Sequence, residues 1–144
     1  VRVSGIVRKG SIVERLSTFY DQIRLYVSDG TQSSLDLAVS KSDPDVIIHL
    51  AGYYVWEHTP AQEADLVEAN IAFGSRLLEA AKKNGTYTFI NTGSHFQYFE
   101  SDKPCPVNFY AETKQAFADI LSEYGKEQGF QFVNLIIWKN RAGD

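Results

Sequence analysis

Hydrophobic residues recur along the chain in patterns that predict alternating strands and helices. Short apolar runs, some continuous and some with period two, predict strands over residues 1–8, 22–27, 46–51, 87–91 and 130–138. Apolar residues spaced three and four apart predict helices over residues 33–41, 61–83 and 109–128. The order β, β, α, β, α, β, α, β is typical of an α/β fold and predicts a doubly wound parallel sheet with right-handed crossovers.

Turn-forming residues separate these segments. Asp43-Pro44-Asp45 ends the first helix, Asn84-Gly85 ends the longest helix, and Gly129 ends the last one. The chain has 144 residues, a usual length for one domain, and it contains no repeat and no low-complexity linker. We therefore predict one domain over residues 1–144.

Composition and charge narrow the class of protein. Apolar residues make up 44% of the chain, so a buried core is expected, and the net charge of −4 argues against nucleic acid or an anionic membrane as the main partner. No apolar run approaches the ~18 residues that cross a bilayer. The single cysteine, Cys105, excludes an internal disulfide, and the three histidines are too scattered to predict a metal site. These features indicate a cytoplasmic protein.

A tyrosine and a lysine stand four residues apart, at positions 110 and 114, near the start of the last predicted helix. Side chains at this spacing share one helix face. Because an ammonium favours a neighbouring phenolate, Lys114 is expected to lower the pKa of Tyr110 from its usual value of about 10. Tyr110 is then a candidate acid or base near neutral pH. The spacing alone more often marks a pair on a helix surface.

Two predicted strands end in small or hydroxyl-bearing residues. One is followed by Thr92-Gly93-Ser94, and the other ends in Ala51-Gly52. Ligands bind open α/β sheets at the carboxyl ends of the strands, where small residues let a flat cofactor approach the backbone. An ordinary tight turn explains Ala51-Gly52 equally well. Together with Tyr110 and Lys114, however, these strand ends predict a ligand site.

These motifs together resemble the extended short-chain dehydrogenase/reductase family of nucleotide-sugar epimerases, dehydratases and reductases. His49-Leu50-Ala51-Gly52 resembles the motif of the family's fourth strand, and Asn70 resembles the structural asparagine of its fourth helix. Tyr110 and Lys114 match the family's YxxxK pair. The resemblance covers nearly the whole chain and implies a Rossmann-type dinucleotide-binding domain.

The resemblance implies a role for each matching position. Tyr110 would exchange a proton with the sugar oxygen, and Lys114 would lower its pKa and hold the nicotinamide ribose. Thr92 falls at the family's catalytic serine or threonine, with Ser94 as the competing choice. Ser94 and His95 are candidate substrate contacts. The expected cofactor contacts are Arg8, Ser11, Asp29, Leu50, Ala51, Gly52, Asn70, Tyr110 and Lys114. In the family the two long helices also form a homodimer interface.

The residues after the first predicted strand bear on the choice of cofactor. In the family an acid usually stands there and binds the 2′-hydroxyl of NAD, whereas this chain has Arg8 and Lys9, followed by Ser11. Basic and hydroxyl groups suit a 2′-phosphate. We therefore expect NADP, with NAD as the alternative. Solvated loop charges are the other explanation for the two basic residues.

The residues after Thr92 bear on the reaction. Dehydratases of the family carry an Asp-Glu pair there, but this chain has Gly93-Ser94-His95, so dehydration is not expected. Segments 91–98 and 106–117 resemble the CDP-4-keto-hexose reductases of the abequose and paratose synthase type. The resemblance implies NADP-dependent reduction of a keto group on a nucleotide-linked deoxyhexose for surface polysaccharide. A nucleotide-sugar 4-epimerase is the alternative within the family. Outside enzymes, the alternatives are a non-catalytic dinucleotide sensor and a dimerisation domain.

Two parts of the family pattern have no counterpart in the sequence. No glycine-rich turn follows a first strand, because Gly5 and Gly10 are wrongly spaced, and the chain stops at Asp144 soon after the last strand. We therefore expect a partial domain from the middle of a longer protein. It would lack the first strand, the glycine-rich turn that binds the pyrophosphate at a helix N-terminus, and the C-terminal substrate lobe.

Overall fold

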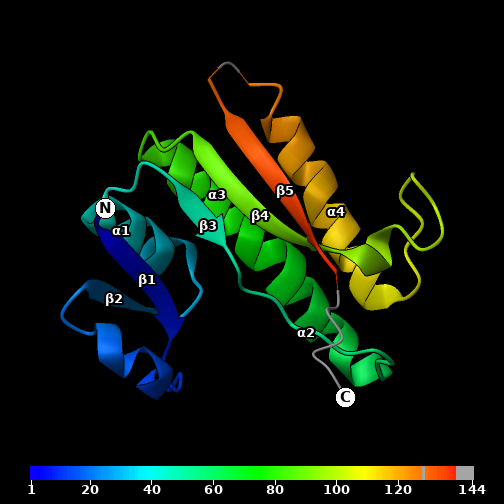
Figure 1. Cartoon of the computed structure of the whole chain (residues 1–144), viewed down its shortest axis with the longest axis horizontal. Coiled ribbons are helices and arrows are strands. Elements are labelled where there is room, and N and C mark those ends of the chain that lie inside the picture. The colour runs from blue at the N-terminus through cyan, green and yellow to red at the C-terminus, as the bar shows by residue number, and fades with distance from the viewer. Residues whose placement is uncertain (128, 139–144) are drawn as a thin grey trace.

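The computed structural model describes residues 1–127 and 129–138, in which five strands alternate with helices (Figure 1). The strands are β1 (Val3–Arg8), β2 (Ile23–Ser28), β3 (Ile47–His49), β4 (Thr88–Ser94) and β5 (Gln131–Ile137). The α-helices are α1 (Gln32–Ser42), α2 (Glu63–Val67), α3 (Phe73–Lys83) and α4 (Phe109–Tyr124). The predicted order is confirmed. A 3-10 helix at Glu14–Phe19 was not predicted, because it buries no residue and so leaves no periodic apolar pattern.

All strand pairs are parallel, but they form two groups. β1 pairs with β2, while β4 lies between β3 and β5. The register places Arg8 opposite Ser28, so β1 and β2 end together, and Ser94 opposite Ile137, so β4 and β5 end together. β3 is shorter and ends at His49, opposite Asn91. The expectation of one doubly wound sheet is therefore met only in part. In the doubly wound order a further strand lies between the strands that correspond to β1 and β3, and the described residues supply none there.

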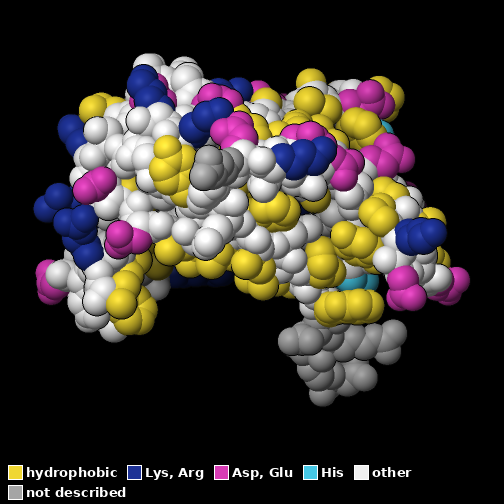
Figure 2. Space-filling model, turned by 90° about the horizontal axis from the view of Figure 1, so that it is seen from above, with side chains coloured by type: hydrophobic (Ala, Val, Ile, Leu, Met, Phe, Trp, Pro, Cys, Tyr) yellow, Lys and Arg dark blue, Asp and Glu magenta, His cyan; other side chains and the backbone are white. Residues whose placement is uncertain are grey.

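The helices cover one face of the three-stranded sheet (Figure 1). Along β3, Ile47 and His49 are buried in the core, whereas Ile48 between them is 58% exposed. The uncovered face is apolar too, because Val133 and Leu135 of β5 are also exposed. Figure 2 shows hydrophobic side chains gathered along the lower edge of the view from above, where this face lies. The continuous apolar runs thus reflect strands with two apolar faces, of which these helices cover one.

The predicted helix over residues 61–83 is not one regular helix. A 3-10 turn at Pro60–Gln62 precedes α2, and a π-helical turn at Glu68–Ala72 separates α2 from α3. Gly85, at φ 76°, follows the helix in the left-handed conformation that glycine adopts without strain. Periodicity alone does not reveal the π-turn. Such turns are frequent at functional sites, and this one contains Asn70.

Two predicted boundaries are wrong by three residues or more, and the others differ by at most two. β4 continues to Ser94, three residues beyond the predicted end at Asn91, because its last three residues still pair with β5. Helix α4 ends at Tyr124 rather than at Gln128, and Gln128 itself lies outside the described residues. The first difference changes the site, because it makes the Thr92–Ser94 segment part of the sheet.

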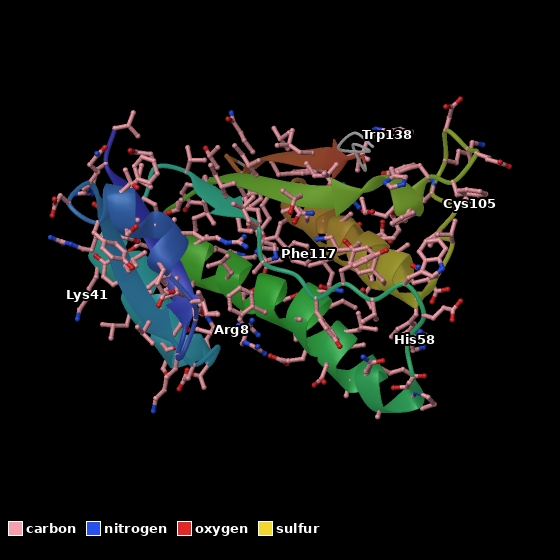
Figure 3. The ribbon with its side chains drawn as sticks, turned by 60° about the horizontal axis from the view of Figure 1, so that its bottom comes forward. Arg8, Lys41, His58, Cys105, Phe117 and Trp138 are labelled. Atoms are coloured by element: carbon pink, nitrogen blue, oxygen red, sulfur yellow. The ribbon has the colours of Figure 1, made fainter. Side chains whose placement is uncertain are left out.

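Phe117 of α4 lies at the centre of the core, between the helices and the strands (Figure 3). Its ring centroid is 5.3 Å from that of His49 and 6.4 Å from that of Phe89. On the helix side, a Cβ added at Gly74 of α3 would lie 2.6 Å from the Phe117 ring. Glycine at this position therefore allows α3 and α4 to approach closely.

Gly74→Ala is expected to destabilise the protein. In an unconstrained helix this change stabilises by about 0.5–1 kcal/mol. Here the added methyl meets a fully buried ring, so we expect a net loss of about 1–3 kcal/mol in the free energy of unfolding, measured by urea denaturation. Phe117→Leu should make the change less costly in the double variant. A Gly74→Ala protein more stable than wild type would contradict the close helix approach.

Candidate active site

A cleft of about 430 Å³ opens at the carboxyl ends of β3 and β4. Residues that follow β3 form one wall, the end of β4 and the turn after it form another, and the first turns of α4 close the cleft. The structure thus brings together eight residues that the sequence singled out: Leu50, Ala51, Gly52, Thr92, Ser94, His95, Tyr110 and Lys114.

Asn108 fixes the start of helix α4. Its side-chain oxygen accepts a hydrogen bond from the backbone N–H of Ala111 at 2.9 Å, which caps the helix. Its side-chain nitrogen donates to the backbone carbonyl of Trp56 at 3.1 Å. The cap therefore ties the helix to the loop that follows β3 and sets the first turn, which carries Tyr110, over the cleft.

Tyr110 is half-buried, and its ring packs edge-on against Tyr54 with the centroids 4.9 Å apart. Burial raises the pKa of the Tyr110 phenol above its ordinary value, a hydrogen bond with the Ser94 side chain lowers it, and Tyr54 raises it. Lys114 makes no comparable contribution. The expectation that Lys114 lowers this pKa is therefore wrong, because helical spacing indicates a shared face but not how deeply the phenol is buried.

Lys114 is buried to 4% exposure at the base of the cleft. Burial lowers the pKa of its ammonium to about 8, so most of the amine is still protonated at neutral pH. Gly52 faces it: a Cβ at Gly52 would lie 3.3 Å from the Asn70 side-chain oxygen and 4.0 Å from the Lys114 amine. The small residue keeps the space in front of the amine open, and Lys114 gives the cleft a positive charge.

The two candidate hydroxyls have different partners. Thr92 donates its hydroxyl hydrogen to the backbone carbonyl of His49 at 3.0 Å, within the sheet. Ser94 is 7% exposed and lines the same cleft as Tyr110, where its side chain works to lower the pKa of the phenol. Because a hydroxyl has one hydrogen to donate and that of Thr92 goes to His49, Ser94 is the better candidate for the partner of the phenol. The family resemblance favours Thr92 instead, with Ser94 as the competing choice.

Asn70 lies behind the cleft and is 1% exposed. Its oxygen accepts from the backbone N–H of Tyr53 at 2.7 Å, and its nitrogen donates to the Tyr53 carbonyl and to the Thr113 hydroxyl, each at 2.9 Å. Thr113 in turn donates to the backbone carbonyl of Tyr110 at 2.7 Å. Both amide hydrogens of Asn70 are thus used within the protein, and its side chain joins the loop after β3 to helix α4.

Arg8, Ser11 and Asp29 lie apart from this cleft, at the carboxyl ends of β1 and β2, and all three are exposed (Figure 3 labels Arg8). Asp29 accepts hydrogen bonds from the hydroxyl of Thr31 at 2.7 Å and from its backbone N–H at 2.9 Å. These bonds lower the pKa of the Asp29 carboxyl to about 2. The carboxylate orders the start of α1 and stays ionised at neutral pH.

Aromatic side chains form one side of the cleft. Tyr54 stacks on Phe96 with the ring centroids 6.3 Å apart, and Trp56 lies 5.0 Å from Phe96. His95 contacts Phe96 at 4.0 Å and stacks on Trp138 at 5.4 Å. Of these residues, His95 is an expected substrate contact, as Ser94 is. Flat apolar surfaces of this kind suit a planar base or the apolar face of a sugar ring.

His49 is buried among three phenylalanines, with ring centroids 5.3–6.0 Å away. Its Nε2 has no hydrogen-bond partner among the described residues. Burial, and secondarily the charge of Lys114, lower the pKa of the imidazole to about 4. His49 is therefore a neutral core residue. In residues 1–127 and 129–138 no group of His, Cys, Asp and Glu side chains is arranged to hold a metal ion, and no described helix is long and apolar enough to cross a membrane.

Comparison with known proteins identifies the family. Residues 2–140 match the sequence pattern of the NAD dependent epimerase/dehydratase family. The chain belongs to this family. No curated protein sequence matches the chain at a significant level.

Solved structures share the fold of this epimerase/dehydratase chain. The Bordetella bronchiseptica enzyme WbmH, in complex with NAD+, has a TM-score of 0.75 and 22% identity over 94% of the chain. The UDP-glucuronic acid 4-epimerase from Bacillus cereus, in complex with NAD, has a TM-score of 0.77 and 23% identity over 95%. The UDP-Glc/GlcNAc 4-epimerase from Campylobacter jejuni has a TM-score of 0.78 and 18% identity over 91%. The chain covers 46%, 48% and 44% of these three structures, about half of each.

Acidification is expected to destabilise the protein through His49. Its pKa is about 4 in the fold and 6.5 without the fold, so as the pH falls through this interval the unfolded chain binds the proton first and stability falls. At a pH near the folded pKa, this group alone lowers the free energy of unfolding by about 3 kcal/mol. At a pH above the unfolded pKa it has no such effect. His49→Phe fills the same aromatic site without a titrating nitrogen and should remove this loss. Urea denaturation of wild type and His49→Phe across this pH interval measures the effect. If the two proteins lose stability equally on acidification, His49 is not the buried neutral group that we describe.

Asn70→Leu is expected to lower the free energy of unfolding by about 2–4 kcal/mol, because it leaves the part-buried N–H and carbonyl of Tyr53 and the buried hydroxyl of Thr113 without this partner. Asn70→Asp keeps the acceptor for the N–H but not the donors, so its loss should be smaller. Asn84→Leu is the matched control: it removes one long surface hydrogen bond, to Asp43 at 3.3 Å, and should cost less than about 1 kcal/mol. Thermal denaturation measures the three variants. If Asn84→Leu costs as much stability as Asn70→Leu, the Asn70 side chain does not join the loop after β3 to helix α4.

Proposed function

We propose that the protein catalyses NAD(P)-dependent oxidation and reduction at a ring carbon of a nucleotide-linked sugar, with 4-epimerisation as the overall reaction. One observation carries the proposal: Tyr110, Ser94 and Lys114 line a single cleft at the carboxyl ends of parallel strands. Membership of the epimerase/dehydratase family supports the class of chemistry. The 4-epimerases among the structures with this fold support the choice of reaction.

The residues of the cleft fit a nicotinamide cofactor. A Cβ at Gly52 would take the space in front of the Lys114 amine, and without it a flat ring can approach the backbone of Leu50 to Gly52. Lys114 would hold the ribose hydroxyls, and Asp29, at the end of β2, would contact the adenine. The bound cofactor supplies hydride transfer to or from the sugar carbon.

Tyr110, assisted by Ser94, would transfer the proton to and from the sugar oxygen. Burial keeps the Tyr110 phenol protonated at neutral pH, so it serves as the acid when the sugar carbon is reduced. When the sugar carbon is oxidised, Tyr110 must act as a base and therefore be deprotonated. The interaction with Ser94 favours this phenolate form, because it lowers the pKa of Tyr110. Ser94 also lies where it holds the same sugar oxygen. Thr92 contributes by fixing the end of β4 to β3.

A second candidate is NADPH-dependent reduction of a keto group on a nucleotide-linked deoxyhexose. Arg8 and Ser11 favour it, because both are exposed at the end of β1, where a 2′-phosphate would lie. Gly93-Ser94-His95 provides no Asp-Glu pair and so disfavours dehydration. A role in surface polysaccharide synthesis, a homodimer through the long helices and a cytoplasmic location stay predictions.

Product analysis of the full-length protein separates these functions. An epimerase interconverts nucleotide hexoses that differ at carbon 4, with NAD+ present and no net change in cofactor absorbance. A reductase consumes NADPH in proportion to product formed from a nucleotide-linked 4-keto-6-deoxyhexose. Cofactor binding without either reaction would indicate a non-catalytic dinucleotide module and would overturn the proposal.

Variants of the three hydroxyl-bearing residues test the assignment of roles. Tyr110→Phe should lower kcat about 10²–10⁴-fold, because the proton donor is lost. Ser94→Ala should lower kcat about 10- to 100-fold, the worth of a hydrogen bond to a charged group, and Thr92→Val less than about fivefold. The dissociation constant of the cofactor, measured by fluorescence, should change little in all three. If Thr92→Val is more damaging than Ser94→Ala, the proposed hydroxyl is the wrong one.

A further inference from the structure

Gln97 is a polar side chain with no exposed surface, immediately behind the cleft. Its oxygen accepts a hydrogen bond from the backbone N–H of Ser94 at 2.8 Å. Its nitrogen donates to the side-chain oxygen of Gln115, on helix α4, at 2.9 Å. The first bond is local and caps the short turn after β4. The second crosses to the helix that carries Tyr110, so Gln97 joins the two elements that bear the proposed catalytic pair.

The surroundings of Gln97 are arranged for this contact. Gln115 donates its own amide hydrogen to Asp119 at 2.8 Å, which turns its oxygen toward Gln97. On the strand side, a Cβ at Gly93 would lie 2.9 Å from the Gln97 oxygen, so glycine makes the room. The sequence does not indicate the bonds of Gln97, because they depend on the packing of the turn after β4 against helix α4.

We propose that Gln97 is a positioning residue for the proposed reaction: its buried amide ties the end of β4 to helix α4 and so holds Ser94 and Tyr110 together in one cleft. The inference rests on the proposed function for its catalytic meaning. Ser94 and Tyr110 belong to different elements, joined along the chain by the long loop 98–108. Because hydrogen bonds are stronger in a buried environment, a tie of this kind restrains the two elements more firmly than the loop does.

An apolar side chain at position 97 would fill the same space but would not tie Ser94 to the helix that carries Tyr110. Methionine has nearly the volume of glutamine, but it offers no acceptor to the Ser94 N–H and no donor to Gln115. The N–H would then be buried without a partner, which favours a shift of the turn that carries Ser94. Loss of the Ser94 hydrogen bond removes the influence that lowers the pKa of Tyr110. Gln97→Met should therefore raise that pKa.

The test is a pH titration of Tyr110 by NMR in the full-length protein labelled at the tyrosine ζ-carbon, with the signal assigned by Tyr110→Phe. Gln97→Met should move the Tyr110 pKa upward, in the same direction as Ser94→Ala, and the double variant should move it no further. Gln115→Met breaks the same tie from the helix side and should act likewise, which keeps the test valid if Gln97→Met does not fold. Where turnover is measurable, kcat should fall about 5- to 50-fold with KM little changed.

Gln32→Met is the matched control. Gln32 on α1 also makes a long-range bond through its side chain, to the carbonyl of Arg76 at 3.0 Å, and lies away from the cleft. It should lower stability without moving the Tyr110 titration. If Gln97→Met and Gln115→Met lower stability but leave the titration as in wild type, Gln97 is merely structural and the proposal is overturned. If the titration moves but the wild type turns over no nucleotide sugar, the positioning role stands and the proposed function alone fails.

Discussion

The packing of helix α4 against the carboxyl ends of β3 and β4 is the constraint on which the candidate active site depends. Gly74 lets α3 approach the Phe117 ring, and that ring holds the middle of α4 against the strands. Asn70 reaches the first turns of α4 through the hydroxyl of Thr113. Gln97 reaches the same helix through Gln115. Three separate contacts therefore fix the helix that presents Tyr110 and Lys114.

Burial of that helix sets the protonation states in the cleft. It raises the pKa of the phenol and lowers that of the ammonium to about 8, so each group stays protonated near neutral pH but for opposite reasons. Tyr110 is held neutral by the cost of a buried negative charge, whereas Lys114 keeps its charge despite burial. The Ser94 hydroxyl is the contact that works against the first effect. Burial therefore dominates the pKa of the phenol, and the Ser94 side chain opposes it.

Most of the fold could be predicted from the sequence, because strand and helix periods are local properties. The order of elements followed from the apolar patterns, and the placement of Thr92 and Ser94 at one sheet edge followed from the strand ends. The pairing of Tyr110 with Lys114 followed from helical spacing and the family resemblance. The π-turn around Asn70 could not be predicted, since its apolar spacing is close to that of an ordinary helix. The extension of β4 to Ser94 depends on pairing with β5, a contact between distant segments. The burial of Tyr110 and the hydrogen bonds of Gln97 are also products of tertiary packing.

The central claim is that the Tyr110 phenol, the Ser94 hydroxyl and the Lys114 amine lie together where the nicotinamide of the cofactor meets the sugar of the substrate. A crystal structure of the full-length protein with NAD+ and a nucleoside diphosphate tests it most directly. The account predicts the Tyr110 hydroxyl within about 2.6–3.2 Å of Ser94 Oγ, with the Lys114 amine on the nicotinamide ribose. A structure in which Thr92 replaces Ser94 at the phenol, or in which Tyr110 faces away from the nicotinamide, would contradict it.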